Sequence, residues 1–461
     1  MLTYQDFERS VDRIEFIARL IAQHEGSEMV KTAKIADEYD AQRNVTINEY
    51  VQKIYNAAGI PVHNYIASNN KIASNFFRRL NTQRCTYSLG NGVTFARDEI
   101  KARLGNKFDT QLKHAGYLAL KHGISFVFLN LAQVHVFPLT EFAPLWDEET
   151  GALRAGVRYW RVDAQKPTFA VLYEQDGYTR YRASGKGVGK LEEAEPKRAY
   201  RLKQQKAPVD AAPEVVGTEN YAGLPIVPLW GSSLRQSTLI GLRQSIDSFD
   251  LIRSGFANDL QDCAQIYWLL ENFGGMSDED LAQFRDRLLF QHTAVIDTQS
   301  GGKVQGYTQE IPYQARMTYL QQIRAGIYED FGALDVTSIS AGSKTATEIN
   351  AAYQPLDENA DDFEYQVIEC VQQILALIGA EDTPIFKRNR ISNQLEQVQM
   401  VMLEAPYLDD ETLLSKLPNI TPDEIEEILK RKDAEDRDRF NAEPDAAEPP
   451  EDVINGDGSG A

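Results

Sequence analysis

The hydrophobic positions near the start of the chain follow a helical period. Four apolar residues recur three or four positions apart, namely Ile14, Ile17, Leu20 and Ile21. A helix brings such positions onto one face, so the pattern predicts helix from Thr3 to about Ala58. Residues 85–95 instead favour strands around a turn at Gly90-Asn91-Gly92, and residues 109–121 favour another helix.

The next stretch of the chain is rich in short apolar runs separated by turn residues. Such runs predict antiparallel strands joined as hairpins, here over residues 125–129, 134–137, 157–160 and 169–173. Residues 184–213 are rich in Gly, Lys, Glu and Ala and indicate a surface excursion. A β-rich body is therefore expected to follow the N-terminal helices.

Two long segments then have apolar residues at alternating spacings of four and three. In the first, over 232–262, these residues are Leu242, Ile246, Phe249, Phe256 and Leu260, with Arg253 in the intervening position. In the second, over 312–332, they are Tyr313, Met317, Leu320, Ile327 and Phe331, with Arg324 in the intervening position. This spacing is typical of helices that pack side by side, so we expect an antiparallel pair.

The residues between these helices, 263–311, predict a small α/β module. Its expected elements are a helix at 277–290 and strands at 265–270, 293–297 and 303–309. After the second helix we expect a small polar loop at 335–344 and a long helix that reaches Gly379 and is kinked at Pro355. Short helices, one beginning near Asp409, and a disordered acidic tail from residue 441 complete the prediction.

The composition limits the classes of protein that fit. A length of 461 residues suggests two to four structural units if domains run to about 150 residues. We expect neither a secretory leader nor a membrane span, because the first residues lack a basic region and the most apolar stretch, 123–137, is short and interrupted. The scattered cysteines Cys85, Cys263 and Cys370 favour neither a disulfide framework nor a zinc site.

The net charge of −20 argues against a protein that grips DNA, because duplex affinity depends on Lys and Arg neutralising phosphates. An acidic surface is compatible with a conduit, where repulsion keeps a polyanion off the walls, or with solubility alone.

Motifs for catalysis and cofactor binding are incomplete. The glycine-rich run 184–190 is followed by Leu191 where a phosphate loop needs Ser or Thr, and Gly342-Ser343-Lys344-Thr345 lacks the required earlier glycine. The six histidines have no metal-ligand spacing, and the chain contains no G-x-S-x-G elbow. We therefore expect no enzymatic activity, no cofactor and no metal.

The order of these predicted elements resembles the portal family of tailed bacteriophages, of the siphovirus type. Several local phrases are similar to that family's: Asn69-Asn70-Lys71-Ile72-Ala73-Ser74-Asn75, Tyr87-Ser88-Leu89-Gly90, residues 139–147, residues 223–229, Ile246-Asp247-Ser248-Phe249-Asp250, and Ser254-x-x-Ala257-Asn258-Asp259-Leu260. Their order and spacing extend over most of residues 1–440.

The resemblance implies an α+β portal fold with named parts. Residues 1–231 would form a wing of N-terminal helices and a β-rich body. The stem would be an antiparallel hairpin of two helices, 232–262 and 312–332, with the α/β insert 263–311 as the clip. Residues 333–393 would form the tunnel loop and a kinked wing helix, residues 394–440 a helical crown, and residues 441–461 a disordered acidic tail.

The resemblance also implies a function as a ring, typically of twelve subunits, at one vertex of a capsid assembled in the host cytoplasm. Double-stranded DNA would pass through the channel of this ring during genome packaging and ejection. The partners it implies are the terminase large subunit, a head-completion or adaptor protein, and the major capsid and scaffolding proteins.

Two groups of residues are expected to line the channel. In the tunnel loop these are Ser340, Gly342, Ser343 and Lys344; Lys344 is either a transient phosphate contact or an exposed loop lysine. On the second stem helix, Gln314, Thr318 and Gln321 form a polar, uncharged face that either lines the channel or packs on a neighbouring subunit. Arg316 and Arg324 either form sparse positive rings or make ion pairs within the helical region.

Two other classes of protein stay open at this point. A structural adaptor of a virion or cell envelope would have no axial channel. A nucleotide-driven motor would need the complete phosphate loop that the sequence lacks.

Overall fold

The computed structural model is a mixed α+β protein with two compact units, residues 1–389 and 390–461. The residues whose structure it describes are 2–56, 58–64, 67–131, 133–163, 165–183, 190–205, 214–262, 267–271, 277–291, 303–307, 312–337, 346–390, 401–417, 424–425, 427–432 and 434.

Four helices open the chain, as the apolar spacing predicts. They are α1 (Tyr4–Arg9), α2 (Arg13–Glu25), α3 (Glu28–Asp40) and α4 (Val45–Glu49). The side chains of Thr3, Asp12 and Ser27 begin the first three by accepting backbone N–H bonds.

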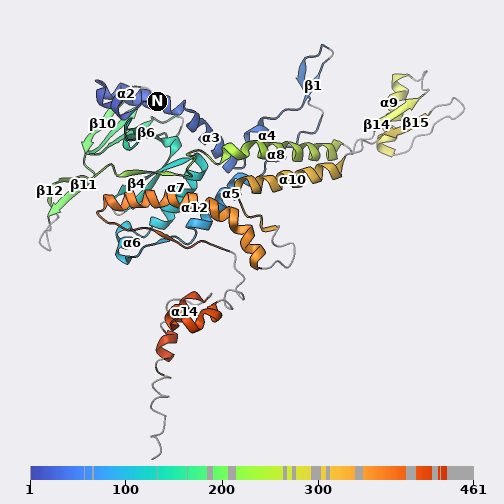
Figure 1. Cartoon of the computed structure of the whole chain (residues 1–461). Coiled ribbons are helices and arrows are strands. Elements are labelled where there is room, and N and C mark those ends of the chain that lie inside the picture. The colour runs from blue at the N-terminus through green and yellow to red at the C-terminus, as the bar shows by residue number, and fades with distance from the viewer. Residues whose placement is uncertain are drawn as a thin grey trace, which may run out of the picture. The chain divides into compact units, whose positions relative to one another are not determined.

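The prediction that helix continues to Ala58 is wrong. The chain there forms an antiparallel hairpin of β1 (Lys53–Tyr55) and β2 (Pro61–His63), seen at the top of Figure 1. Asn56 makes the turn, because its Oδ1 accepts the amides of Ala58 and Ile60 at 3.0 and 2.9 Å. An asparagine side chain that bonds its own backbone in this way competes with a helix.

The prediction of strand from Cys85 is also wrong, because α5 (Phe76–Leu89) is helical to its end. This helix is buried around much of its circumference, at Leu80, Cys85 and Leu89 among others, so it lacks the one-sided apolar period of a surface helix. The predicted turn is confirmed, with a φ of 71° at Gly92. The strand that follows it, β3 (Val93–Thr94), pairs with β16 (Ile385–Phe386).

Two antiparallel sheets form the β-rich body that the sequence predicts. The larger has the order β10-β9-β8-β7-β6 and the smaller β13-β4-β5. Their strands are β4 (Ile124–Asn130), β5 (Gln133–Pro138), β6 (Phe142–Trp146), β7 (Leu153–Trp160), β8 (Phe169–Glu174), β9 (Gly177–Ala183), β10 (Leu191–Arg198) and β13 (Ile226–Trp230). A separate hairpin pairs β11 (Arg201–Gln205) with β12 (Glu214–Glu219).

Strand β4 shows how the core is layered. Its Phe126 and Phe128 pack in a cluster with the larger sheet, while Val127 and Leu129 pack in a cluster with helices α7 (Phe108–His122) and α12 (Ala346–Leu377). Alternate side chains of a strand point to opposite faces, so β4 has an apolar layer on each side. Helix α6 (Asp98–Leu104) adds to the second layer, and α2 covers the far face of the larger sheet.

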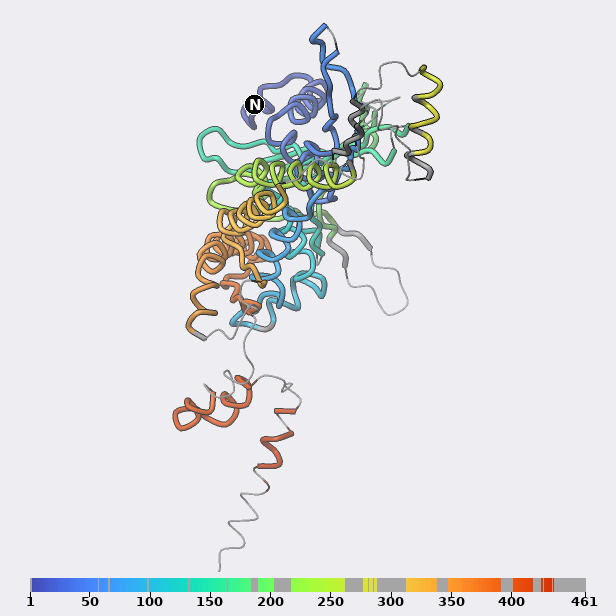
Figure 2. The backbone as a smooth tube through the Cα atoms, turned by 90° about the vertical axis from the view of Figure 1, so that its right-hand side faces the viewer, coloured from blue at the N-terminus to red at the C-terminus, as the bar shows by residue number. Residues whose placement is uncertain are grey.

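The two long helices are confirmed as α8 (Leu239–Asp262) and α10 (Tyr313–Phe331), which lie side by side in Figures 1 and 2. Helix α8 begins at Leu239, later than the predicted residue 232. At this start, Ser237 Oγ accepts the amide of Leu239 at 3.2 Å. Between them, β14 (Tyr267–Glu271) pairs with β15 (Lys303–Tyr307), and α9 (Asp278–Gln291) lies between these strands in sequence. The strand predicted at 293–297 lies outside the described residues.

The long helix near the C-terminus is confirmed as α12, with Pro355 inside it. Proline removes one hydrogen bond of a helix and bends it, and Figure 1 shows that α12 changes direction along its length. In the second unit, α14 (Asp410–Lys416) begins at Asp409 as predicted, because this side chain accepts the amide of Thr412 at 3.2 Å. The predicted disordered tail, 441–461, lies outside the described residues.

Candidate functional site

Helices α8 and α10 are antiparallel and are anchored at one end in the body. Leu242 and Ile246, near the start of α8, share a buried cluster with Ile327 and Phe331, near the end of α10. Phe249 packs edge to face on Phe76 of α5, with ring centroids 5.0 Å apart. Five residues of the two predicted apolar seams therefore lie in or against one core, together with residues of α3 and α5.

The opposite end of this helix pair is much less enclosed in the single chain. Leu260 is 56% exposed and Met317 is 49% exposed, while Phe256 and Leu320 are half-buried. The Arg316 guanidinium lies 5.9 Å from the ring of Phe256 and forms an ion pair with Asp259. The apolar seam thus continues beyond the body with part of its surface open.

A row of polar side chains on α8 holds an extended segment of the chain. The backbone N–H groups of Asn70, Ile72 and Ser74 donate to the side chains of three successive turns of α8. The acceptors are Asn258 Oδ1 at 2.6 Å, Ser254 Oγ at 3.0 Å and Asp250 Oδ1 at 2.9 Å.

The geometry of helix and strand explains this row. Two residues of extended chain advance about 6.6 Å and four residues of helix about 6 Å, so alternate amides can meet every fourth helical residue. Asp250 is fully buried and also accepts from the side-chain amide of Asn44, and burial raises the pKa of its carboxyl. We call residues 70–74 with Asp250, Ser254 and Asn258 the helix–strand clamp.

The end of α10 is held by α5 and α12. Gly332 ends the helix in the left-handed region, with φ 62°. The last helical carbonyl, that of Phe331, accepts from the Arg84 guanidinium at 2.7 Å and from Asn359 Nδ2 at 3.3 Å. Arg84 also lies over the Phe331 ring at 4.2 Å, and burial lowers the pKa of its guanidinium to about 10.

The predicted polar face of α10 is on the surface. Gln314, Thr318 and Gln321 are all exposed in the single chain. Arg324, which lies on the same helix, donates to Asp335 at 3.0 Å and to Thr337 at 2.9 Å. Both arginines of α10 that the sequence singles out are therefore in ion pairs with their own chain.

The predicted tunnel-loop residues Ser340, Gly342, Ser343 and Lys344 lie outside the described residues. The described chain ends on one side at Thr337, whose hydroxyl and amide both donate to Asp335. Since Asp335 also pairs with Arg324, the start of this loop is tied to α10.

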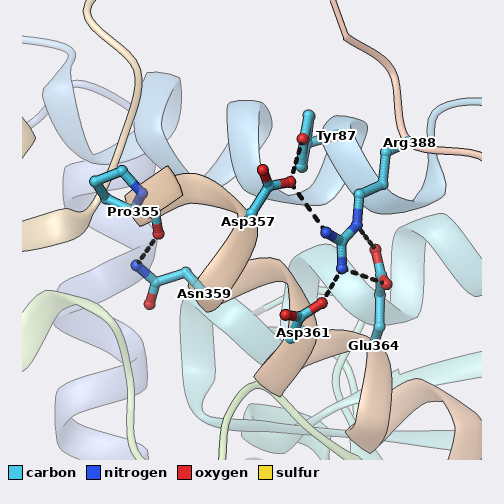
Figure 3. Close-up of polar contacts among 7 residues, drawn as sticks. All are labelled: Tyr87, Pro355, Asp357, Asn359, Asp361, Glu364 and Arg388. Atoms are coloured by element: carbon cyan, nitrogen blue, oxygen red, sulfur yellow. Dashed lines mark hydrogen bonds and ion pairs between the residues drawn. The ribbon is translucent and has the colours of Figure 1, made fainter. Parts of the chain in front are cut away.

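A cluster around Arg388 joins α12 to the residues that follow it (Figure 3). The guanidinium donates to both oxygens of Glu364, at 3.0 and 2.9 Å, and to Asp357 at 3.0 Å. It also pairs with Asp361. Tyr87 of α5 donates to the same oxygen of Asp357 at 2.6 Å, so one arginine links three turns of α12 with α5.

Comparison with known families decides what kind of protein carries this arrangement. Residues 8–438 match the family model described as phage portal protein, SPP1 Gp6-like. The chain belongs to this family of phage portal proteins. Portal proteins of this family are structural components of phage particles.

Two curated relatives carry the same name. A portal protein of Clostridium phage phiCD119 is 28% identical over 221 residues, which are 46% of this chain and 48% of the relative. The portal protein of Bacillus phage SPP1 is 22% identical over 442 residues, 89% of this chain and 84% of the relative. The match to the first relative thus spans about half of its length.

The motifs behind the predicted resemblance also have a structural role in this portal chain. The phrase 69–75 and three polar residues of the two α8 phrases, Asp250, Ser254 and Asn258, meet in the helix–strand clamp. Sequence reasoning did not assign Asp250, Ser254 and Asn258 this contact, although their spacing of four on one helix was a usable signal. Arg84 and Arg388 had no such signal, because their partners are distant in sequence.

In the described part of the chain, no group of three or more His, Cys, Asp or Glu side chains is arranged to hold a metal ion. No helix among the described residues has the length and apolarity to cross a membrane.

Proposed function

We propose that the chain is one subunit of a portal ring at a capsid vertex, where its channel carries double-stranded DNA during genome packaging and ejection. The observation that supports this best is the antiparallel α8/α10 pair with the β14, α9 and β15 segments between its helices, in a chain that matches the family over residues 8–438. A ring of twelve subunits is the expected assembly, with no enzymatic activity of its own.

The parts of the ring are assigned as follows. Residues 1–231 form most of the wing, residues 232–262 and 312–332, which contain α8 and α10, the stem, and residues 263–311 the clip. Residues 333–393 form the tunnel loop and the wing helix containing Pro355, and residues 394–440 the crown. The clip would contact the terminase large subunit and later a head-completion or adaptor protein, while other surfaces contact the major capsid and scaffolding proteins.

The exposed seam supports assembly into a ring. Leu260 and Met317 leave apolar surface uncovered at the end of the stem, and Tyr313 is 55% exposed beside them on α10. Exposed apolar surface of this kind is typical of a contact with another protein, and a head-to-tail ring covers it with a neighbouring subunit.

The charges of the stem fit a channel that lets DNA pass. Gln314, Thr318 and Gln321 offer phosphates only neutral hydrogen bonds, which contribute little net free energy and exchange easily with water. The carboxylates of Asp259 and Asp335 partly neutralise Arg316 and Arg324. We retain Lys344 as the transient phosphate contact of the tunnel loop, since a ring would repeat its charge once in every subunit.

Negative-stain microscopy with native mass measurement of the purified chain tests this function. We expect rings with an axial channel and a mass that is a whole multiple of the subunit mass. A structural adaptor would give assemblies without a channel, and a motor would hydrolyse ATP. A chain that stays monomeric under all conditions would contradict the proposal.

A further inference from the structure

An arginine-rich cavity is lined by residues from both sheets of the body and by no described residue of α8 or α10. Its volume is about 580 Å³, and it is lined by Phe128 and Asn130 of β4, by residues of strands β7 to β10 and by Tyr200. Arg158, Arg180 and Arg182 all line it, and they are the only arginines among the described residues that do so. We call this cavity the arginine–aromatic groove.

The pairing of the strands places its key residues in two rows. Arg158, Val171 and Arg180 are register partners across β7, β8 and β9, and so are Trp160, Phe169 and Arg182. The two rows are two residues apart along each strand, and residues at this spacing lie on the same face of a sheet. The larger sheet therefore presents arginine and aromatic side chains together on the face that lines the groove.

The aromatic rings and guanidinium groups are organised by contact with each other. Trp160 stacks on Phe169, with ring centroids 5.7 Å apart. Arg158 lies over the Trp160 ring at 4.7 Å, and Arg182 lies over the Phe169 ring at 5.6 Å. Such contacts hold flat apolar and cationic surfaces in place before a ligand arrives, which lowers the entropic cost of binding.

The groove is positive in a strongly acidic chain. Glu195 provides the only carboxylate among the described lining residues and pairs with Arg180 at 3.2 Å, while Arg158 pairs with Glu141 at 3.2 Å. Arg182 is exposed and has no carboxylate partner in the part of the chain that the structure describes. The net charge of the whole chain is −20, so a cluster of three arginines is a local reversal of sign.

These features define the chemistry of a ligand. Aromatic-lined grooves bind proline rings of extended peptides, and guanidinium groups bind carboxylates through paired hydrogen bonds. The chain itself contains such a peptide in Glu448-Pro449-Pro450-Glu451-Asp452, preceded by Glu443-Pro444-Asp445. Residues 441–461 contain no Lys or Arg.

We propose that the arginine–aromatic groove binds the acidic, proline-containing segment 443–452 of a second copy of the chain. Prolines of the segment contact Trp160 and its aromatic neighbours, and its carboxylates pair with Arg182 and Arg180. The inference goes beyond the portal function and does not depend on it.

Fluorescence anisotropy with a labelled peptide of residues 441–461 tests the groove. The receptor is the full chain carrying Glu448→Gln, Glu451→Gln and Asp452→Asn, so that its own segment competes less for the groove. We expect saturable binding that Arg182→Glu weakens at least tenfold and that rising salt weakens further. Arg19→Glu, which changes an exposed arginine of α2 outside the groove, is the matched control and should leave the affinity unchanged.

Further variants separate the chemistry of the peptide from a general attraction of charges. Trp160→Leu should weaken binding of the peptide, and a labelled peptide with the same three neutral substitutions should bind at least tenfold more weakly. Arg182→Lys keeps the positive charge but loses the paired hydrogen bonds, so its affinity should lie between those of the unchanged receptor and of Arg182→Glu.

Three outcomes would each overturn the inference. They are absence of peptide binding, equal loss of binding with Arg19→Glu, and binding of a short DNA duplex in place of the peptide. Rings seen by microscopy would still support the portal function in any of these cases.

Discussion

At the scale of single residues, burial decides the chemistry of several ionisable groups. His24 of α2 is 4% exposed and its Nδ1 lies 2.9 Å from the hydroxyl of Tyr159. Burial lowers the pKa of His24 to about 4 from its ordinary 6.5, because a charged imidazole is poorly solvated there. Its Nε2 is buried without a partner in the described part of the chain. The imidazole is therefore held in its neutral form.

This pKa predicts how stability depends on pH. Between pH 6.5 and about 4 the unfolded chain binds a proton at His24 that the folded chain does not, so stability falls as the pH falls through this window. The loss should amount to roughly 3 kcal/mol by pH 4. Urea unfolding of His24→Gln between pH 7 and 4 should show a flatter pH dependence than that of the unchanged chain.

A matched control is His135→Gln, which changes an exposed histidine of β5 and should leave the pH dependence as it is. Equal slopes for the unchanged chain and for His24→Gln would contradict the assignment of this effect to His24.

At the scale of elements, the helix–strand clamp shows how a polar surface can hold two segments together. Asp250 and Asn258 are 0% and 7% exposed, so their hydrogen bonds to the backbone of residues 70–74 are shielded from water. When a buried N–H group loses its acceptor, the folded state is destabilised by the cost of desolvating that N–H group. The clamp therefore fixes the middle and later turns of α8, the helix proposed as part of the stem.

Asp250→Ala should lower the free energy of unfolding by about 1–3 kcal/mol, because the backbone amide of Ser74 and the side-chain amide of Asn44 both lose an acceptor. Asp250→Asn should cost less, since it keeps an oxygen for the Ser74 amide. Ser248→Ala, at an exposed position of the same helix, is the control. Urea unfolding checks the three variants, and hydrogen exchange at residues 70–74 should rise only in those at position 250.

At the scale of the whole first unit, contacts between residues 83–97 and 331–389 bring distant parts of the chain together. Strand β3 pairs with β16, the amide of Asn389 donates to the carbonyl of Tyr87, and Gln83 exchanges two hydrogen bonds with the backbone of Leu334. Arg388 adds its three carboxylate partners on α12. The last residues of the unit are thus secured on α5 and α12.

Removing this arginine should loosen that attachment. In Arg388→Ala the carboxylates of Asp357, Asp361 and Glu364 would face one another without a cation, and we expect the free energy of unfolding to fall by about 1–2 kcal/mol. The difference should shrink at high salt, because screening weakens the repulsion that involves the exposed carboxylate of Asp361.

Thermal unfolding at low and high salt measures the effect, and hydrogen exchange at residues 385–389 locates it. Arg19→Ala is the control for loss of an exposed positive charge. An Arg388→Ala chain as stable as the unchanged one, with unchanged exchange at 385–389, would show that the cluster does not secure the end of the unit.

The sequence by itself determined the features that depend on local periodicity. Apolar spacing predicted α8 and α10, and turn residues predicted the meander of strands, because a helix or a strand places its own near neighbours on one face. Two local predictions failed, at the β1/β2 hairpin and at α5. At the hairpin, the turn made by the Asn56 side chain overrode the helical pattern. In α5, burial around much of the helix removed the one-sided apolar period that predicts a helix.

Only the tertiary structure decided which residues meet across long stretches of chain. It brought segment 70–74 to α8, Arg84 to the end of α10 and Arg388 to three carboxylates, and it gathered Arg158, Arg180 and Arg182 around one groove. A hydrogen bond or an ion pair leaves no period in a single sequence when its partners are far apart in the chain. The physical reason is that such contacts arise from the packing of whole elements, whereas the sequence pattern reports only the burial of each element.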